Sequence, residues 1–585
     1  MCSIIGYRGK GAAAPVIVSG LKRMEYRGYD SVGVATESGK KINLKKGIGR
    51  VAEVNSSAGL DALPGTTGIG HTRWATHGKV TRANAHPHSS NSGSIAIVHN
   101  GIIENFEELK SSLSAQGYTF ESETDTEVIA NLLQKNHDAT GSVKEAVVKT
   151  VSEIEGHYAF VAMFEDGQLA AARFHEPLIL GIGQDDLFLS SDVLGFIEYT
   201  DDAVYMKDGS FAMLEDGKFQ IFDFDGTDTS YEVTKVSKEF GDAYKGDYAH
   251  FTLKEIYEQP ETVMRAGEKT TDAIKTAALL IRNTKSIYVT GSGTSYNAAL
   301  LAKQILSRYA KIKVEPIISS ELPFSPDIIE DDSVFVAMSQ SGESADVLEA
   351  VRIAKQAGCK IISIVNLTSS SLARESDIVI GMNCGPEIGV AATKSFTAQL
   401  AVLYKLAEQL GGQTGTDFGG ISESMLEMLE NPTTIQQIAG KLRNVSDIYV
   451  LGRGIHYPIA IEAALKLKEL TYIHAEGIAG GELKHGPLAL MDSGVYVIII
   501  NPDDTTYSDT LTSAREIKTR GAKIIGISNV KSDVYDYWIE IPSTGEESYP
   551  ILEIVPVQLL SYYAALEKDT DPDYPRNLAK SVTVK

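Results

Sequence analysis

Residues 333–351, Ser333-Val-Phe-Val-Ala-Met-Ser-Gln-Ser-Gly-Glu-Ser-Ala-Asp-Val-Leu-Glu-Ala-Val351, decide the fold of the second half of the chain. An apolar, strand-like run ends at Met338, a hydroxyl-rich turn covers Ser339–Ser344, and a helical pattern begins at Ala345. Backbone N–H groups and the dipole at a helix N-terminus attract anions, and the turn has no Lys with which to grip a nucleotide as a Walker loop does. The turn therefore suits one small phosphate, such as that of a sugar. The alternative is a serine-rich turn that only caps the helix.

The turn belongs to one copy of an internal repeat. Ser286-Ile-Tyr-Val-Thr-Gly291 matches Asp447-Ile-Tyr-Val-Leu-Gly452, and 452 minus 291 gives an offset of 161 residues. Val334–Val336 matches Val495–Val497 at the same offset. Repeated strand–loop–helix units predict two α/β domains with helix-covered parallel sheets, in which ligands bind at the carboxyl ends of strands. The second copy has Ile500-Asn-Pro-Asp-Asp504 in place of the turn, so we expect only the first copy to bind phosphate.

A second loop, Gly291-Ser-Gly-Thr-Ser295, follows the first repeated strand. It is not a dinucleotide-binding loop, because Tyr296 occupies the place of the third glycine. We expect Thr294 and Ser295 to add hydroxyl groups to the same phosphate site.

Composition excludes several classes of protein. The chain has 585 residues, 43% hydrophobic and 22% charged, with a net charge of −23, so nucleic acid and anionic membrane surfaces are unfavourable partners. The cysteines, Cys2, Cys359 and Cys384, cannot form a disulfide framework or a four-cysteine zinc site. His86 and His88 lack an evident third metal ligand and are interpreted as part of a loop. We expect a multidomain cytoplasmic protein without a membrane span or secretory signal.

Residues near the N-terminus suit nucleophilic chemistry. Removal of Met1 would leave Cys2 with a thiol nucleophile and an α-amine base on one residue. Arg73 suits a two-point grip on a carboxylate, and Asn100 beside the N–H of Gly101 is one way to build an oxyanion hole. Asp125 precedes a predicted helix that begins at Glu127.

These motifs resemble the glutaminase domain of class II (N-terminal nucleophile) amidotransferases over residues 2–235. Glu25-Tyr-Arg-Gly-Tyr-Asp-Ser31 and His71-Thr-Arg-Trp-Ala-Thr-His-Gly78 resemble the glucosamine-6-phosphate synthase family in particular. The resemblance implies an α+β domain of four α/β/β/α layers. It implies a nucleophile, Cys2; an oxyanion hole, Asn100 and Gly101; and a glutamine-binding set, Arg73, Trp74, Thr76, His77 and Asp125. Within that set, Arg73 would bind the α-carboxylate, Asp125 would bind the α-amine, and Trp74 would gate ammonia. Ser3 departs from the glycine common in the family.

The second repeat carries different residues. Pro458–Leu470 is predicted as a helix with Glu462, Lys466 and Glu469 in one polar stripe that faces a cleft; a solvated face is the alternative. His485 lies further on, and the chain ends in a tail that contains Lys580.

This half resembles the two sugar isomerase (SIS) domains of the same family. The resemblance rests on residues 339–344, 387–391, 464–469, 482–489 and 576–584. It implies a sugar-phosphate site of Thr294, Ser295, Ser339, Gln340, Ser341, Ser344 and Val390. Lys580 would form a Schiff base with the ketone, Glu469 would move the C1–C2 proton, and His485 would assist ring opening with Lys466 nearby. Ala392 departs from the usual serine.

The resemblance covers essentially the whole chain. It implies a glutaminase domain over 2–240, a linker over 241–265, SIS domains over 266–420 and 421–575, and a catalytic tail over 576–585. The implied reaction moves the amide nitrogen of glutamine to fructose 6-phosphate, giving glucosamine 6-phosphate and glutamate in a homodimer without metal or cofactor. The alternatives are an amidotransferase or deglycase for another amino sugar, and a phosphosugar-sensing regulator. Such a regulator would not need Cys2, Glu469, His485 and Lys580 together.

Overall fold

The computed structural model describes residues 2–74, 78–215, 217–236, 245–268, 271–284, 286–412 and 415–582. The chain forms two compact units, one of residues 1–242 with 581–585 and one of residues 243–580, and each is described by itself. Within the described ranges, no helix is both long enough and apolar enough to cross a membrane.

The first unit is built on two antiparallel sheets. The eight-stranded sheet has the order β14 (Thr234–Lys235), β11 (Asp202–Tyr205), β9 (Ile179–Ile182), β10 (Leu187–Ser190), β1 (Ser3–Arg8), β4 (Thr67–Arg73), β2 (Ser31–Glu37) and β3 (Ile42–Ile48). The six-stranded sheet has the order β13 (Lys218–Asp223), β12 (Ser210–Glu215), β8 (Leu169–Phe174), β7 (Gly156–Phe164), β6 (Ile95–Ile103) and β5 (His88–Ser89). The helices are α1 (Ala13–Arg23), α2 (Val51–Ala58), α3 (Phe106–Ala115), α4 (Thr126–Thr140) and α5 (Val143–Glu153).

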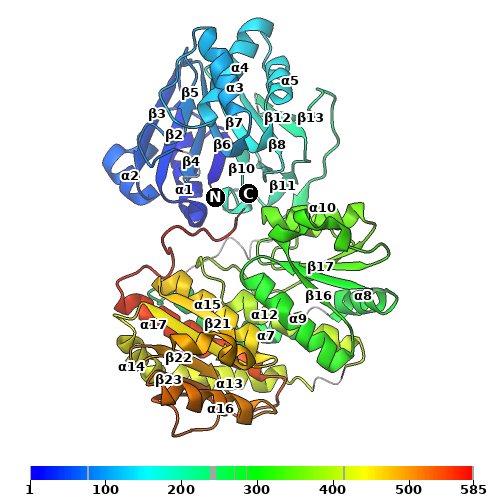
Figure 1. The fold of residues 1–585 in the computed structure, drawn as a ribbon. Helices are drawn as coiled ribbons and strands as arrows, with labels where there is room; N and C mark the ends of the chain where they lie inside the picture. The colour runs from blue at the N-terminus through cyan, green and yellow to red at the C-terminus, as the bar shows by residue number, and fades with distance from the viewer. Residues whose placement is uncertain are drawn as a thin grey trace. The chain divides into compact units, whose positions relative to one another are not determined.

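The apolar residues of these strands separate into three cores because successive side chains point to opposite faces of a sheet. Ile4 packs between the two sheets, whereas its neighbour Ile5 packs against α1 on the outer face. Helices α3, α4 and α5 cover the other sheet with a third core that includes Val128 and Phe160, and Figure 1 shows these helices together. The four-layer α/β/β/α prediction is confirmed.

The second unit contains two five-stranded parallel sheets. The first has the order β16 (Glu315–Ile318), β15 (Ile287–Gly291), β17 (Val334–Ser339), β18 (Lys360–Val365) and β19 (Ile378–Gly381). The second has the order β21 (His474–Ala479), β20 (Asp447–Gly452), β22 (Tyr496–Ile500), β23 (Lys523–Ser528) and β24 (Tyr537–Glu540). The strand order is the same in both copies, so the predicted duplication of parallel α/β domains is confirmed.

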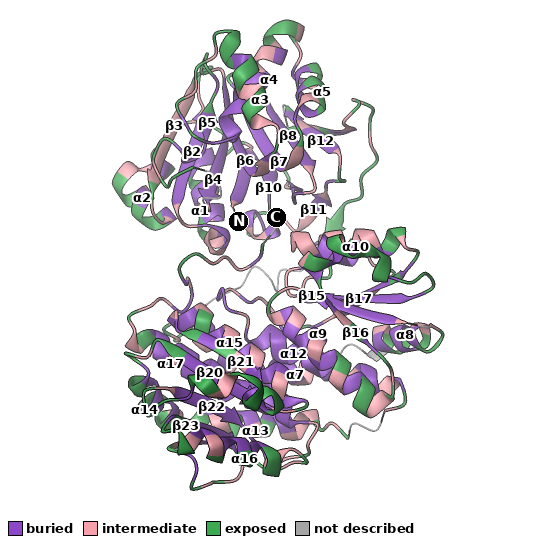
Figure 2. Ribbon diagram, viewed as in Figure 1, coloured by how far each residue is buried: buried purple, intermediate pink, exposed green. Residues whose placement is uncertain are grey.

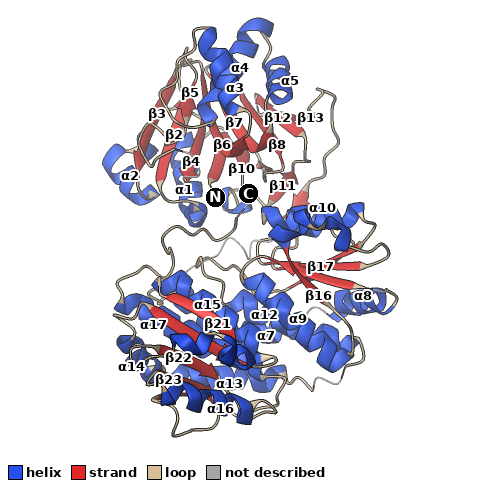
Figure 3. Cartoon of the chain, in the orientation of Figure 1, coloured by secondary structure: helices blue, strands red, loops and turns tan. Residues whose placement is uncertain are grey.

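Helices surround these sheets, as Figure 3 shows. They are α6 (Phe251–Tyr257), α7 (Gln259–Glu268), α8 (Thr271–Arg282), α9 (Thr294–Ile305), α10 (Ala345–Gln356), α11 (Ser371–Arg374), α12 (Lys394–Gln409), α13 (Phe418–Glu430), α14 (Thr433–Lys441), α15 (His456–Thr471), α16 (Tyr507–Thr519) and α17 (Tyr549–Glu567). Short helical turns include η6 (Ser319–Phe324), η8 (Gly480–His485) and η9 (Pro487–Leu490). One continuous core draws residues from both sheets and from α12 and α17, and these two helices are among the most buried elements in Figure 2.

The sequence pattern predicts a helix over residues 248–258 that Pro260 stops. Helix α6 does end at Tyr257, but a further helix, α7, follows directly, with Pro260 as its second residue. Proline has no N–H group, but the N–H groups of the first helical turn make no hydrogen bonds within the helix. A proline near the start of a helix therefore costs no hydrogen bond. Helices α6 and α7 thus form part of the packed second unit, with α7 against α12 and α13.

Candidate active sites

Cys2 lies immediately before β1, next to the end of β4. The backbone N–H of Trp74 donates to Cys2 Sγ over 3.2 Å, and the thiol donates to the Trp74 carbonyl over 3.5 Å. Desolvation raises the pKa of the Cys2 thiol, while the Trp74 N–H and the charge of Arg73 act in the opposite direction. Ser3 does not crowd this thiol, because its hydroxyl donates to the Met24 carbonyl over 2.8 Å.

The Asn100 carboxamide, on β6, points its nitrogen toward Cys2. Asn100 Nδ2 donates to the Cys2 carbonyl over 3.1 Å, and Asn100 Oδ1 lies 3.1 Å from His71 Nε2. His71 Nε2 also lies 3.0 Å from the His99 carbonyl, so the two acceptors require a proton on that nitrogen. Burial lowers the pKa of His71 to about 3, so it stays neutral and orients Asn100. Gly101 has a φ of 107°, and a Cβ there would lie 2.0 Å from the His157 carbonyl oxygen, so a side chain is excluded.

Arg73 and Asp125 belong to the same region of the first unit. Burial lowers the pKa of the Arg73 guanidinium, and the charges of Cys2, Asp30 and Asp125 oppose that shift. Arg73 Nη1 donates to the Lys79 carbonyl over 3.2 Å, and Asp125 Oδ2 accepts from the Ile103 N–H over 2.9 Å. Arg73 is thus a buried cation beside Cys2, and Asp125 is a buried anion close enough to act on the charge of Arg73. Thr76 and His77, also predicted to bind glutamine, lie outside the described residues.

His86 and His88 form part of a hydrogen-bonded cluster. His86 Nε2 lies 3.3 Å from Thr126 Oγ1, and His88 Nε2 lies 3.2 Å from Thr124 Oγ1. Burial holds the pKa values of both histidines well below the usual range. Within the described part of the chain, no group of three or more His, Cys, Asp or Glu side chains is arranged to hold a metal ion.

The 339–344 loop lies between β17 and α10 in the first SIS copy. Ser339 Oγ accepts from the Gly342 N–H over 3.0 Å, and Ser341 Oγ accepts from the Glu343 N–H over 3.2 Å. Gly342 has a φ of 67°, and a Cβ there would lie 2.1 Å from Ser370 Oγ. Ser344 occupies the N-cap position of α10 but makes no side-chain cap hydrogen bond. The Ser344 side chain therefore does not itself cap the helix in this structure.

The 291–295 loop emerges beside the 339–344 loop, because β15 and β17 are adjacent parallel strands. Ser295 is buried at the start of α9, where its Oγ accepts from Gln399 Nε2 over 2.9 Å and keeps its own proton for a ligand. Thr294 differs, because its hydroxyl donates to Glu462 Oε1 over 3.0 Å and accepts from Lys466 Nζ over 3.0 Å. Ser295 is thus available to an anion, whereas Thr294 connects α9 to α15.

The polar stripe of α15 is more deeply buried than a cleft-facing stripe would be. Glu462 and Lys466 are fully buried, and Lys466 Nζ lies 3.3 Å from Glu462 Oε1 and 2.6 Å from Glu469 Oε2. Asn297 Nδ2 donates to Glu462 Oε2 over 2.7 Å. Burial lowers the pKa of Lys466, but the two carboxylates outweigh it and raise the pKa above its ordinary value. The stripe therefore faces α9 of the other copy, and only Glu469 is partly exposed, at 20% of its side chain.

Lys580 lies in the C-terminal tail and is held by the 387–391 segment. Its Nζ lies 2.5 Å from Glu387 Oε2 and 2.8 Å from the Gly389 carbonyl oxygen, with 3% of the side chain exposed. Burial acts to raise the pKa of Glu387, but Lys580 and backbone N–H donors lower it to about 2. The tail is also fixed upstream, since the Arg576 N–H donates to the Tyr472 hydroxyl over 2.7 Å.

Two further predicted residues lie differently. The Val390 N–H donates to the Asp573 carbonyl over 3.1 Å, so it already has a partner within the protein. His485 is exposed at the end of η8, and among the described residues no hydrogen bond joins it to Lys466, Glu469 or Lys580.

Sequence reasoning missed several polar partners of these sites. They are Arg27, which donates to the Cys2 carbonyl; Gln399, the partner of Ser295; Asn297, the partner of Glu462; and Glu387, the partner of Lys580. Glu387 begins the quoted 387–391 motif, so that signal was present. Nothing in the sequence pattern pairs Gln399 with Ser295, because the contact spans 104 residues.

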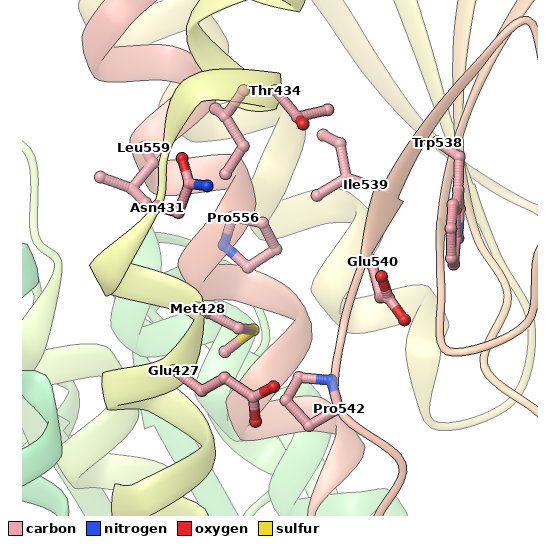
Figure 4. A pocket seen from close by; sticks show the side chains of 11 residues that line it. Glu427, Met428, Asn431, Thr434, Trp538, Ile539, Glu540, Pro542, Pro556 and Leu559 are labelled. Atoms are coloured by element: carbon pink, nitrogen blue, oxygen red, sulfur yellow. The ribbon is translucent and has the colours of Figure 1, made fainter.

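A separate cavity of about 330 Å³ lies between α13, α14, β24 and α17 (Figure 4). Glu427, Met428, Trp538 and Pro556 are among its lining residues, and none of the predicted site residues lines it.

The fold and the two sites define a class of protein in which a glutamine amidotransferase domain is joined to a pair of SIS domains. The SIS domain family matches residues 280–409 and 441–568, and the Glutamine amidotransferase domain family matches residues 71–197.

Full-length relatives specify the family. The isomerizing glutamine–fructose-6-phosphate aminotransferase of Pyrococcus horikoshii is 44% identical over 598 residues, and that of Thermococcus kodakarensis is 42% identical over 607 residues. Each match covers 100% of both chains. Among solved structures, the C-terminal domain of glucosamine-fructose-6-phosphate aminotransferase from Francisella tularensis covers 56% of this chain and 99% of its own, with 38% identity and a TM-score of 0.52. The chain belongs to the isomerizing glutamine–fructose-6-phosphate aminotransferase family.

Proposed function

We propose that the protein transfers the amide nitrogen of L-glutamine to D-fructose 6-phosphate and isomerises the product to D-glucosamine 6-phosphate. The observation that carries the proposal is the buried amine of Lys580, held by Glu387 and Gly389 in the unit that also contains the 339–344 loop. A protein that only senses a sugar phosphate would not need such an amine.

The first half-reaction releases ammonia. With Met1 removed, the α-amine of Cys2 accepts the thiol proton, and the thiolate attacks the amide carbon of glutamine. Asn100 Nδ2 and the Gly101 N–H stabilise the oxyanion, and His71 keeps the Asn100 amide in the donating orientation. Ammonia leaves, and water hydrolyses the thioester to glutamate. Arg73 and Asp125 bind the α-carboxylate and the α-amine of glutamine.

The second half-reaction begins with anchoring of the sugar phosphate. Its oxygens accept hydrogen bonds from Ser295 and from the 339–344 loop at the N-terminus of α10. In this proposal the phosphate-binding set is Ser295, Ser339, Gln340, Ser341 and Ser344, with Thr294 and Val390 shaping the site through their contacts to Lys466 and Asp573.

The chemistry takes place at the other end of the sugar. The free amine of Lys580 condenses with the C2 carbonyl and releases water, and ammonia then displaces Lys580 from C2. Glu469 moves a proton from C1 to C2, which gives the aldehyde of glucosamine 6-phosphate. Lys466, paired with both Glu462 and Glu469, keeps Glu469 in place. The condensation at C2 releases one water molecule, and hydrolysis of the thioester at Cys2 consumes one, so the overall reaction neither uses nor produces water.

His485 is proposed to assist opening of the sugar ring. We further propose that the enzyme works as a homodimer in the cytoplasm and does not act on nucleic acid. An amidotransferase for another ketose phosphate is the second candidate, and parallel assays with other ketose phosphates discriminate between the two.

The deciding test is product analysis with glutamine and fructose 6-phosphate. Glucosamine 6-phosphate and glutamate should form in equal amounts, and Cys2→Ala should abolish glutamine use. Surviving glutamine turnover in Cys2→Ala would contradict the assigned nucleophile. Mass spectrometry of the intact N-terminus tests whether Met1 is removed.

A further inference from the structure

Glu255, on α6, is a buried carboxyl group that the proposed mechanism does not use. It is 1% exposed, and its Oε1 accepts from the backbone N–H of Ile388 over 2.5 Å and from that of Gly389 over 3.1 Å. Its Oε2 is buried without a hydrogen-bond partner among the described residues.

The same segment holds Lys580 on its other side. Glu387 Oε2 and the Gly389 carbonyl oxygen both accept from Lys580 Nζ. Gly389 has no room for a side chain, since a Cβ would lie 2.7 Å from Thr252 Oγ1 and 2.9 Å from Glu255 Oε2. Residues 387–389 are therefore clamped between the Glu255 carboxyl group and the Lys580 amine.

Helix α6 is itself fixed against the C-terminal segment. The Asp573 carboxylate accepts from the N–H groups of Phe251 and Thr252, at 2.9 and 2.8 Å, and caps the helix. The Asp573 carbonyl accepts from Val390 N–H. Glu255 thus lies on a helix that is anchored to the segments before Lys580 and after Gly389.

We propose that Glu255 is a positioning residue for Lys580: by binding two backbone N–H groups, it sets the Glu387 carboxylate and the Gly389 carbonyl that hold the amine. This role deepens the proposed function and rests on it.

Burial favours the neutral form of Glu255, against the charges of two nearby lysines. Burial raises its pKa to about 8, Glu387 acts in the same direction, and Lys580 and Lys394 oppose it. Asp573 caps the N-terminus of the same helix, and Glu258, its C-cap residue, is paired with Lys394 over 2.5 Å. Above pH 8, an ionised Glu255 would add a second negative charge beside Glu387 and oppose release of the Lys580 amine toward the substrate.

The test compares Glu255→Leu, which removes the acceptors, with Glu255→Gln, which keeps them and mimics the neutral acid. Asp377→Ala is the matched control, because Asp377 Oδ2 also accepts a backbone N–H, that of Ile361 at 2.8 Å, within the first SIS copy. Full-length protein is incubated with fructose 6-phosphate and borohydride, and the reduced Lys580 adduct is measured by mass spectrometry. Synthase activity is followed from pH 6.5 to 9.5, with glutamine hydrolysis as a separate readout.

We expect Glu255→Leu to lower adduct formation and kcat by about 100-fold, the effect of a misplacement of about 1 Å, with glutamine hydrolysis unchanged. Wild-type synthase activity should fall as pH rises through about 8, where Glu255 ionises. Glu255→Gln should have near-normal activity at pH 7 and should not show this fall. Asp377→Ala should match the wild type. Normal adduct formation in Glu255→Leu would overturn the inference. An inactive Glu255→Gln variant would also overturn the inference, as would a Glu255→Gln variant with the pH profile of the wild type.

The pH profile of Glu255→Gln decides the question even where Glu255→Leu does not fold. A wild type that makes no glucosamine 6-phosphate would contradict the proposed function and the inference with it. An active wild type with an unimpaired Glu255→Leu would contradict the inference alone.

Discussion

The two SIS copies have the same strand order but fill the same place in the fold differently. In the first copy, Ser295 at the start of α9 accepts a hydrogen bond from Gln399 on α12. In the second copy, the residue 161 positions later is His456 at the start of α15, and its Nδ1 lies 2.8 Å from Glu553 on α17. A neutral pair in one copy is therefore an ionic pair in the other.

The loops after the central strands complete this contrast. The first copy has the 339–344 loop, whereas the second has Asp504, whose Oδ2 lies 2.9 Å from His456 Nε2. Burial acts to lower the pKa of His456, but Glu553 and Asp504 raise it to about 9, and His456 holds the pKa of Asp504 below its usual range. The second copy has thus placed its own carboxylate where the first is proposed to bind a phosphate. A duplicated site can keep its fold after losing its ligand if an internal ion pair occupies the position.

The largest expected effect separates anchoring from chemistry. Lys580→Ala should lower kcat by about 10⁴-fold, because the Schiff base between Lys580 and the ketone can no longer form, while the phosphate loop stays intact and KM for fructose 6-phosphate changes little. Steady-state kinetics with both substrates measures this. A variant with normal kcat and a raised KM would assign Lys580 to binding instead.

Asp504→Ala should break the ionic pairing of the second copy. It leaves the His456 cation buried with one fewer partner, and breaking a buried pair costs about 3–5 kcal/mol of unfolding free energy. Urea denaturation gives that value, and Asp503→Ala, at an exposed neighbouring position, is the control. KM for fructose 6-phosphate should stay normal in properly folded protein; a raised KM would place substrate in the second copy.

The Ser339→Ala/Ser344→Ala double variant tests the first copy. Loss of two hydrogen bonds to a charged phosphate, each contributing about 1.5 kcal/mol, should raise KM for fructose 6-phosphate by about 100-fold. Glutamine hydrolysis should be unaffected. An unchanged KM would mean that the loop only caps α10.

The pH dependence of stability is the smallest expected effect. Because the pKa of folded His456 is about 9, above its ordinary value near 6.5, its stabilisation is fully present below pH 6.5 and is lost as pH rises through 9. The unfolding free energy should fall by at most about 1.4 kcal/mol per pH unit from this group. His456→Gln should flatten that part of the curve, and an identical slope in wild type and variant would exclude the assignment.

Local patterns predicted much of this molecule, because strands, turns and caps depend on neighbouring residues. The β17–loop–α10 unit and the duplication were predicted in this way, whereas the four-layer domain was implied by the family resemblance. The buried side of α15 was not, since the partners of Glu462 are Thr294 and Asn297, more than 160 residues away. The role of Glu255 was not predicted for the same reason. The sequence around α6 was interpreted as a linker, and the contacts of Glu255 with Ile388 and Gly389 depend on tertiary packing.

The most direct test of the central claim is a crystal structure of the protein with fructose 6-phosphate bound. The account predicts phosphate density against Ser295 and residues 339–344, with C2 of the sugar bonded to Lys580 Nζ. It also predicts that Asp504 remains paired with His456 in the second copy. Phosphate density at residues 500–504, or a sugar with C2 remote from Lys580, would contradict it.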